Sequence, residues 1–301
     1  MIVFIATHRD RRTQGLRWGF EPICRVLEIS PATVRSAIAR PTCARRVADA
    51  ALKVRIRTIW DENYQVYGIR KIRAMLAREG QRVAKNRVAR LMRELGIRGA
   101  TRGRRVFTTR PDKDHVRAPD LVKRDFTAPA PNRLWVMDFT YVATWAGMVY
   151  VAFVIDVYSR MIVGWNLATT MRTDLVMTAL EQAVWRRDTI LDELITHSDA
   201  GSQYTAIRFT DRLVEIGARP SIGTVGDSYD NAMAESVNGL YKTELVWRQG
   251  PWRTAEQLEL ATLLYVEWFN TRRIHAEIGD LTPTEFETAH YLAHHPSTIN
   301  V

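Results

Sequence analysis

The chain has 301 residues, of which 46% are hydrophobic and 25% charged, a composition typical of a soluble globular protein with one sizeable core and one or two small domains. No apolar run reaches the roughly 20 residues that a membrane-spanning helix needs. The two cysteines, Cys24 and Cys43, match neither a disulfide framework nor a zinc motif. We therefore expect a cytoplasmic protein with no membrane partner.

The charge is divided unevenly along the chain. Residues 1–124 hold 30 Lys+Arg against 11 Asp+Glu, whereas residues 125–301 hold 13 against 22. A basic half joined to an acidic half indicates that one part binds a polyanion and the other has a different task. Arginine supplies most of the positive charge, and its planar guanidinium suits bidentate phosphate contacts.

The first 48 residues predict a small helical segment. Residues 20–39, "FEPICRVLEISPATVRSAIA", predict two short helices separated by a break at Ser30, with the second helix starting at Pro31.

Residues 49–99 predict a helix-turn-helix-like DNA-binding domain. Two apolar stripes at helical spacing are separated by Gly80 and closed by Gly96. Five side chains off the second stripe are suited to a groove and its phosphates: Lys85, Asn86, Arg87, Arg90 and Arg93. A recognition helix presents such residues to DNA. The alternative is a helical bundle with a solvated basic face.

Residues 100–124 lack periodicity and predict a basic linker, after which the pattern changes. Three apolar, β-branched and aromatic runs separated by short breaks predict an antiparallel meander: 133–144, 148–160 and 161–170. Helices and strands then alternate at 173–187, 193–199, 205–216, 218–224 and 230–245. This order predicts an α/β, ribonuclease-H-like core with a mixed five-stranded sheet and flanking helices over residues 125–290. Residues 291–301 would form a tail.

Three carboxylates stand out in this core. Asp138 lies inside an apolar strand, where a carboxylate is costly to bury unless it is paired or binds a metal. Asp199 follows the fourth strand, at a sheet edge that places residues in a crevice, and Glu235 lies on a later helix. Three converging acids repel one another, so the site needs divalent cations. Hard oxygen ligands suit Mg²⁺ or Mn²⁺, and two such ions can activate a nucleophile and stabilise the leaving oxygen of a phosphodiester.

The words around these acids carry a family resemblance. "WVMDFTYV", "HSDAGSQYT" and "DNAMAESVNGLYKTEL" resemble the DD(35)E signature of insertion-sequence transposases of the two-reading-frame, orfB type, which share the catalytic core of retroviral integrases. "YGIRKIRAMLAREGQRVAKNRVARLMRELGIRG" is similar to that family's helix-turn-helix-like segment. "FNTRRIHAEIGDLTPTEFE" resembles its C-terminal Asn-x-x-Arg-x-His…Thr-Pro-x-Glu element. The chain departs from the family at Ala200, where arginine is usual, and at 276–279, which leaves the role of His275 open.

The resemblance implies a site and a reaction. It assigns Asp138, Asp199 and Glu235 as catalytic ligands of two Mg²⁺ ions, with Mn²⁺ able to substitute, and it assigns DNA contacts to Lys242 and Arg273. It further implies cleavage and strand transfer of double-stranded DNA at terminal inverted repeats, with target DNA as the second substrate. Its expected partners are copies of the chain, as a homo-multimer on DNA, and an upstream orfA-type product joined by a frameshift fusion.

Four other acids near the three carboxylates are expected to have structural or surface roles and to bind no metal. Asp156 is expected to be a member of a strand end and not a ligand. Glu244, nine positions after Glu235, falls on the opposite helix face, so replacing it with glutamine should be nearly silent. Asp227 and Asp230 are expected to cap the helix. Two other functions compete with a transposase: a DNA-binding regulator with an inactive core, and a structure-specific nuclease of related fold.

Overall fold

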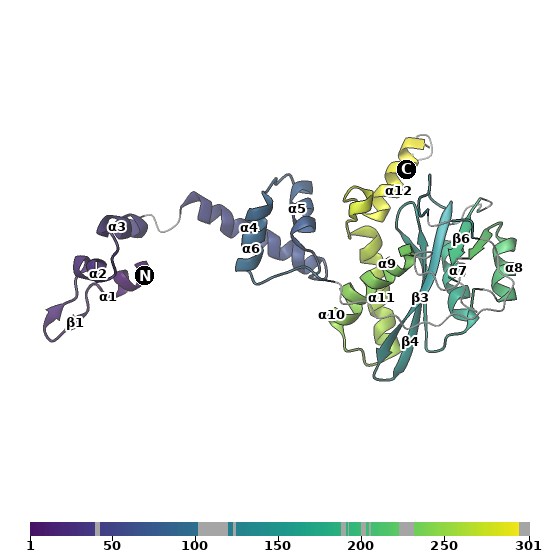
Figure 1. The fold of residues 1–301 in the computed structure, drawn as a ribbon, viewed down its shortest axis with the longest axis horizontal. Coiled ribbons are helices and arrows are strands. Elements are labelled where there is room, and N and C mark those ends of the chain that lie inside the picture. The colour runs from purple at the N-terminus through teal and green to yellow at the C-terminus, as the bar shows by residue number, and fades with distance from the viewer. Residues whose placement is uncertain are drawn as a thin grey trace.

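A five-stranded sheet organises the C-terminal half of the chain (Figure 1). The computed structural model describes residues 1–39, 43–101, 120–122, 125–187, 191, 193–199, 203–204, 206–222 and 232–294. The strands are β3 (Leu134–Thr144), β4 (Gly147–Asp156), β5 (Ile162–Ala168), β6 (Ile195–Ser198) and β7 (Arg219–Ile222), in the spatial order β5-β4-β3-β6-β7. The first three form an antiparallel meander, and β6 and β7 run parallel to β3. The predicted mixed five-stranded sheet is confirmed.

Alternate side chains of β3 enter two different apolar cores. Trp135 and Met137 pack with α7 (Thr173–Arg187) and α8 (Ile207–Glu215). Val136 and Val142 pack with α9 (Ala232–Tyr241) and α11 (Ala255–Thr271), which lie on the other side of the sheet (Figure 1). Successive side chains of a strand point to opposite faces. Asp138 therefore shares the face of Val136, the face that α9 covers.

The helix α7 lies directly on strand β5 at Gly164. A Cβ atom at this position would lie 2.1 Å from the carbonyl oxygen of Ala179 and 2.9 Å from the Cβ of Ala183. Because a backbone oxygen in a helix cannot move aside easily, the lack of a side chain at Gly164 allows this close helix–sheet contact.

The helical unit that lies before the core, over residues 44–94, consists of α4 (Ala44–Glu62), α5 (Ile69–Arg78) and α6 (Lys85–Glu94). The predicted stripes of α5 and α6 are buried, and the chain leaves both helices through left-handed glycines, Gly80 at φ +79° and Gly96 at φ +66°. The helix α4 begins five residues before the boundary expected at residue 49.

The N-terminal unit is a small cluster of short elements around its own core of Ile5, Ile23, Cys24 and Val34. It consists of α1 (Ile2–His8), the two-stranded hairpin β1 (Arg12–Thr13) and β2 (Leu16–Arg17), α2 (Phe20–Val26) and α3 (Pro31–Ala39). The helix α3 starts at the proline that the sequence pattern indicated, whereas α1 and the hairpin had no predicted counterpart.

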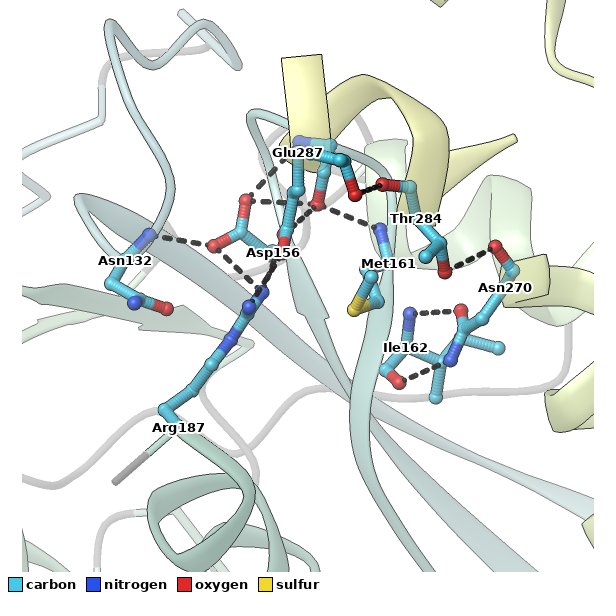
Figure 2. Close-up of polar contacts among 10 residues, drawn as sticks. Asn132, Asp156, Met161, Ile162, Arg187, Asn270, Thr284 and Glu287 are labelled. Atoms are coloured by element: carbon cyan, nitrogen blue, oxygen red, sulfur yellow. Dashed lines mark hydrogen bonds and ion pairs between the residues drawn. The ribbon is translucent and has the colours of Figure 1, made fainter. Parts of the chain in front are cut away.

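The C-terminal helices are fastened to the sheet by buried polar groups. After α9 the chain continues through a π-helical turn, η1 (Lys242–Val246), α10 (Trp247–Gln249), α11, the short η2 (Ala276–Ile278) and α12 (Pro283–His294). The amide of Asn270 on α11 accepts a hydrogen bond from the Ile162 N–H and donates one to the Ile162 carbonyl, both at 2.9 Å (Figure 2). The helix α12 extends four residues into the segment expected to be a tail.

Among the helices of the described residues, none is both long and apolar enough to cross a lipid bilayer.

Candidate active site and nucleic-acid interface

Asp138 lies in the middle of β3, paired with Phe153 of β4 in the sheet register. Its carboxylate accepts hydrogen bonds from the N–H of Phe139 (2.8 Å) and from the side-chain amide of Asn238 on α9 (2.9 Å). The Asn238 bond joins the strand that carries Asp138 to the helix that carries Glu235, because residues 235 and 238 lie one turn apart on that helix.

The three predicted carboxylates share one electrostatic environment. Burial raises the pKa of Asp138 well above its usual value, and the negative charges of Asp199 and then Glu235 raise it further. Asp199 follows the end of β6, the strand parallel to β3, and Glu235 lies in the first turn of α9. Sheet pairing and helix packing thus bring three acids that are distant in sequence into mutual repulsion.

This donor set fits a divalent cation in its chemistry. Repulsion among carboxylates around a partly buried one is relieved when a hard cation binds their oxygens. The Asn238 side-chain oxygen is buried and has no hydrogen-bond partner in the described part of the chain, so an unused acceptor lies in the side chain that bonds Asp138. Within that same part, however, no three acidic, histidine or cysteine side chains lie close enough to form a ready-made cage. The carboxylates would have to draw together around the ion.

Two residues of this site were not predicted. Asn238 follows Glu235 by one turn of the helix, but its bond to Asp138 joins residues that are distant in the sequence. Tyr204 lies within the "HSDAGSQYT" word, and its buried hydroxyl has no partner among the described residues. Burial, then Asp138 and Asp199, raises the pKa of Tyr204 well above its usual value, so the phenol stays protonated as a donor facing the acids.

Lys242 begins the π-helical turn after α9. Its Nζ lies 4.6 Å from the ring centroid of Tyr141 on β3, and the side chain is half-buried. The cation–π contact holds the ammonium beside the strand that carries Asp138.

Arg273, for which a DNA contact was predicted, is almost fully buried and paired within the protein. Its side chain is 5% exposed and forms a bidentate pair with Glu244, from Nε to Oε2 at 2.8 Å and from Nη2 to Oε1 at 2.7 Å. Glu244 also accepts from the Tyr265 hydroxyl at 3.2 Å. Both oxygens of Glu244 are thus engaged within the protein, and its replacement by glutamine should lower the stability, because the buried arginine would lose its counter-charge.

Asp156 has a structural role, in agreement with its ordinary interpretation. Its carboxylate accepts from the Asn132 N–H at 2.7 Å and lies 3.5 Å from an Arg187 nitrogen (Figure 2). Arg187 in turn donates two hydrogen bonds to Glu287 of α12, at 2.7 and 2.6 Å. Burial raises the pKa of Asp156, and the arginine opposes this rise. All the carboxylate oxygens here have protein partners, so the cluster joins elements and offers no open ligand.

The predicted recognition helix α6 presents its polar face next to α4. Arg87 and Arg90 are each paired with Asp49 of α4, at 2.7 and 2.5 Å, and Arg90 also bonds Glu94. The hydrogen bond from Arg90 holds the pKa of Asp49 below its usual value. A surface cavity of about 420 Å³ is lined by Arg45, Asn86, Arg87 and Arg90. Lys85 and Arg93 are exposed on the same helix.

Some predictions fall outside the described residues. These are the helix caps at Asp227 and Asp230, the departure at Ala200 and nearly all of the basic linker.

Comparisons with known proteins agree with these features. A family model described as "Integrase core domain" matches residues 128–228, a second model of the same description matches 216–283, and an "HTH-like domain" matches 47–105. Together these domains indicate DNA binding.

Two curated relatives resemble nearly the whole chain. A putative transposase for insertion sequence element IS986/IS6110 from Mycobacterium tuberculosis is 51% identical over 269 residues, 88% of this chain and 97% of the relative. A transposase for insertion sequence element IS629 from Shigella sonnei is 46% identical over 280 residues, 91% of this chain and 93% of the relative. A solved structure of the HTLV-2 integrase catalytic core domain in complex with magnesium is 15% identical and covers 53% of this chain and 98% of its own, with a TM-score of 0.41. The family models and the two curated relatives show that the chain belongs to the insertion-sequence transposases, DDE-type polynucleotidyl transferases that join a helix-turn-helix-like domain to an integrase core.

Proposed function

We propose that this transposase cuts and rejoins DNA strands at the terminal inverted repeats of its own element, with Asp138, Asp199 and Glu235 holding divalent cations. The observation that carries the proposal is the shared repulsion of these acids around Asp138, which is partly buried on β3. Such an arrangement is unfavourable in a protein that never binds a cation. It also argues against a regulator with an inactive core.

The metal is Mg²⁺, for which Mn²⁺ can substitute, and two ions are expected. When bound, they supply an activated nucleophile and charge stabilisation at the phosphodiester. The residues of this chain would orient the ligand: the Asn238 amide and the Phe139 N–H each fix one oxygen of Asp138, and each oxygen keeps a lone pair with which it could bind an ion. Tyr204, kept protonated near Asp138 and Asp199, places a neutral hydroxyl beside the acids.

DNA is held in two places. The cavity beside the N-terminal end of α6 is suited to a backbone phosphate, because arginine side chains and a helix N-terminus converge there. Asp49 fixes Arg87 and Arg90 in position while their remaining N–H groups stay available. Lys242 contacts a phosphate close to the carboxylates.

The chain acts as a multimer on DNA together with the upstream orfA-type product. No apolar heptad pattern occurs before residue 125, so this part of the chain offers no coiled coil of its own to bring two ends together. A dimerising partner would raise the effective concentration of the second binding site.

The proposal is tested by Asp138→Asn, Asp199→Asn and Glu235→Gln, with cleavage and joining of terminal-repeat DNA measured in Mg²⁺ and in Mn²⁺. Each variant should lose both activities while DNA binding in a gel shift is kept, because binding lies mainly in the basic half. Glu267→Gln, an exposed acid on α11, is the control and should retain activity. Normal cleavage by any of the three variants would remove that residue from the site.

A further inference from the structure

A π-helical turn follows directly on the helix that carries Glu235. Such turns hold one residue more than an α-helical turn and change the directions of the side chains that follow. In η1, Lys242 is half-buried beside Tyr141, whereas Glu244, Leu245 and Val246 are all buried. Three consecutive buried residues span more than half of an α-helix circumference. The turn therefore needs a cause that draws residue 244 inward.

The buried Glu244–Arg273 pair supplies that cause. Both oxygens of the carboxylate meet nitrogens of one planar guanidinium, at 2.7 and 2.8 Å, and this bidentate geometry fixes the orientation of both groups. Breaking the pair would leave a buried charge, so Glu244 cannot leave this position without a large cost.

Arg273 is itself immobilised. Its guanidinium lies 5.3 Å from the ring centroid of Phe269, and a further nitrogen bonds His275 at 3.1 Å. The neighbouring Ile274 N–H donates to the Tyr67 hydroxyl at 2.9 Å, which connects this segment to the unit containing α5. The arginine is thus a fixed anchor against which the π-helical turn is set.

We infer that Glu244 and Arg273 are positioning residues for Lys242: by fixing η1 they hold the ammonium beside β3, where DNA is cleaved. Lys242 and Glu244 belong to the same five-residue turn, so anchoring one sets the direction of the other. The inference rests on the proposed function only for the DNA contact of Lys242. The placement of Lys242 is a separate matter that can be measured without DNA.

The matched comparison is Glu244→Gln against Glu287→Gln. Glu287 is also a buried glutamate in a bidentate pair, with Arg187, but it joins α12 to α7 and does not contact η1. Both substitutions exchange a carboxylate for an amide beside a buried arginine, so both should lower Tm. Only the first should affect Lys242.

Placement is measured by ¹³C NMR of the reductively methylated protein. The chain has six lysines, and Lys242→Arg assigns the resonance. The methyl signal of Lys242 should carry a ring-current shift from Tyr141 that Tyr141→Leu abolishes. Glu244→Gln should abolish it as well, whereas Glu287→Gln should retain it. An unchanged shift in folded Glu244→Gln protein would overturn the inference.

The consequence is measured by cleavage kinetics in a double-mutant cycle. Loss of one charged phosphate contact should raise KM for terminal-repeat DNA by about tenfold with little change in kcat. Lys242→Ala and Glu244→Gln should each show this increase, and the double variant should be no worse than Lys242→Ala alone. Multiplying effects would show that Glu244 acts independently and would overturn the inference. If Lys242→Ala leaves KM unchanged while Glu244→Gln still abolishes the NMR shift, the positioning stands and the proposed DNA contact fails.

Discussion

Replacing Arg187 with methionine should cost the catalytic core about 3–5 kcal/mol of unfolding free energy, the range for removing one partner of a buried ion pair. The arginine side chain is 9% exposed, Glu287 7% and Asp156 1%, so little solvent can compensate the two acids left behind. Methionine fills much of the volume of the apolar part of the arginine side chain, so the lost unfolding free energy measures mainly the removal of the charged group.

The cost should depend on pH. Burial raises the pKa of Asp156 in the folded state, and Arg187 opposes the rise, so the variant raises that pKa further. When the pKa of an aspartate is higher in the folded protein than in the unfolded chain, protonation stabilises the fold. This stabilisation is fully present below the unfolded-state pKa, about 3.9, and is lost as pH rises through the folded-state pKa. The difference between wild type and variant should therefore shrink from pH 7 to pH 5.

The assay is urea unfolding followed by circular dichroism, with hydrogen exchange in β4 to identify the core transition. Arg212→Met is the matched control: this arginine also forms a bidentate pair, with Glu181, but at the surface, so its loss should cost at most about 1 kcal/mol. A loss below about 1 kcal/mol for Arg187→Met, or a loss that is constant between pH 7 and pH 5, would refute the reasoning.

Three further predictions follow from single positions. Burial, then the charges of Arg273 and Lys71, hold the pKa of His275 well below its usual value. The stability that the neutral ring contributes is therefore present above about pH 6.5 and is lost as pH falls below it. In His275→Gln, the free energy of unfolding from urea titrations should fall less between pH 6.5 and pH 5 than it does in the wild type. Gly164→Ala should destabilise the core by about 1–3 kcal/mol in the same assay, since its Cβ would meet a backbone oxygen; an unchanged midpoint would show that α7 shifts freely. Lys85→Ala and Arg93→Ala should each lower the slope of log affinity against log salt by about one in gel shifts. An unchanged slope would show that the replaced side chain contacts no phosphate.

The sequence predicted the mixed five-stranded sheet and the order of its strands along the chain, because β-branched and aromatic runs with short breaks are compatible with few other structures. It identified Asp138 from the cost of a carboxylate within such a run. The helix stops at Gly80 and Gly96 were equally readable, since left-handed glycine ends a helix for local reasons.

Tertiary partners were not readable in the same way. Arg273 looked like a DNA contact because exposed and buried arginines are identical in a sequence, and only the fold reveals Glu244 opposite it. Asn238 and Tyr204 lie near the acids in the sequence, but their interactions with Asp138 depend on tertiary packing against β3. The π-helical turn left no local signal that periodicity analysis detects.

The side chain of Asn270 has a consequence for how the protein behaves in concentrated solution. Strand β5 is the outermost strand on its side of the sheet, where free backbone groups would act as a template for a strand from another molecule. Asn270 occupies both the N–H and the carbonyl of Ile162, and Gln182 occupies the Trp165 N–H at 2.7 Å. These amide side chains occupy backbone groups that a sixth strand would otherwise bond. We therefore expect this edge to resist the addition of a strand from another molecule.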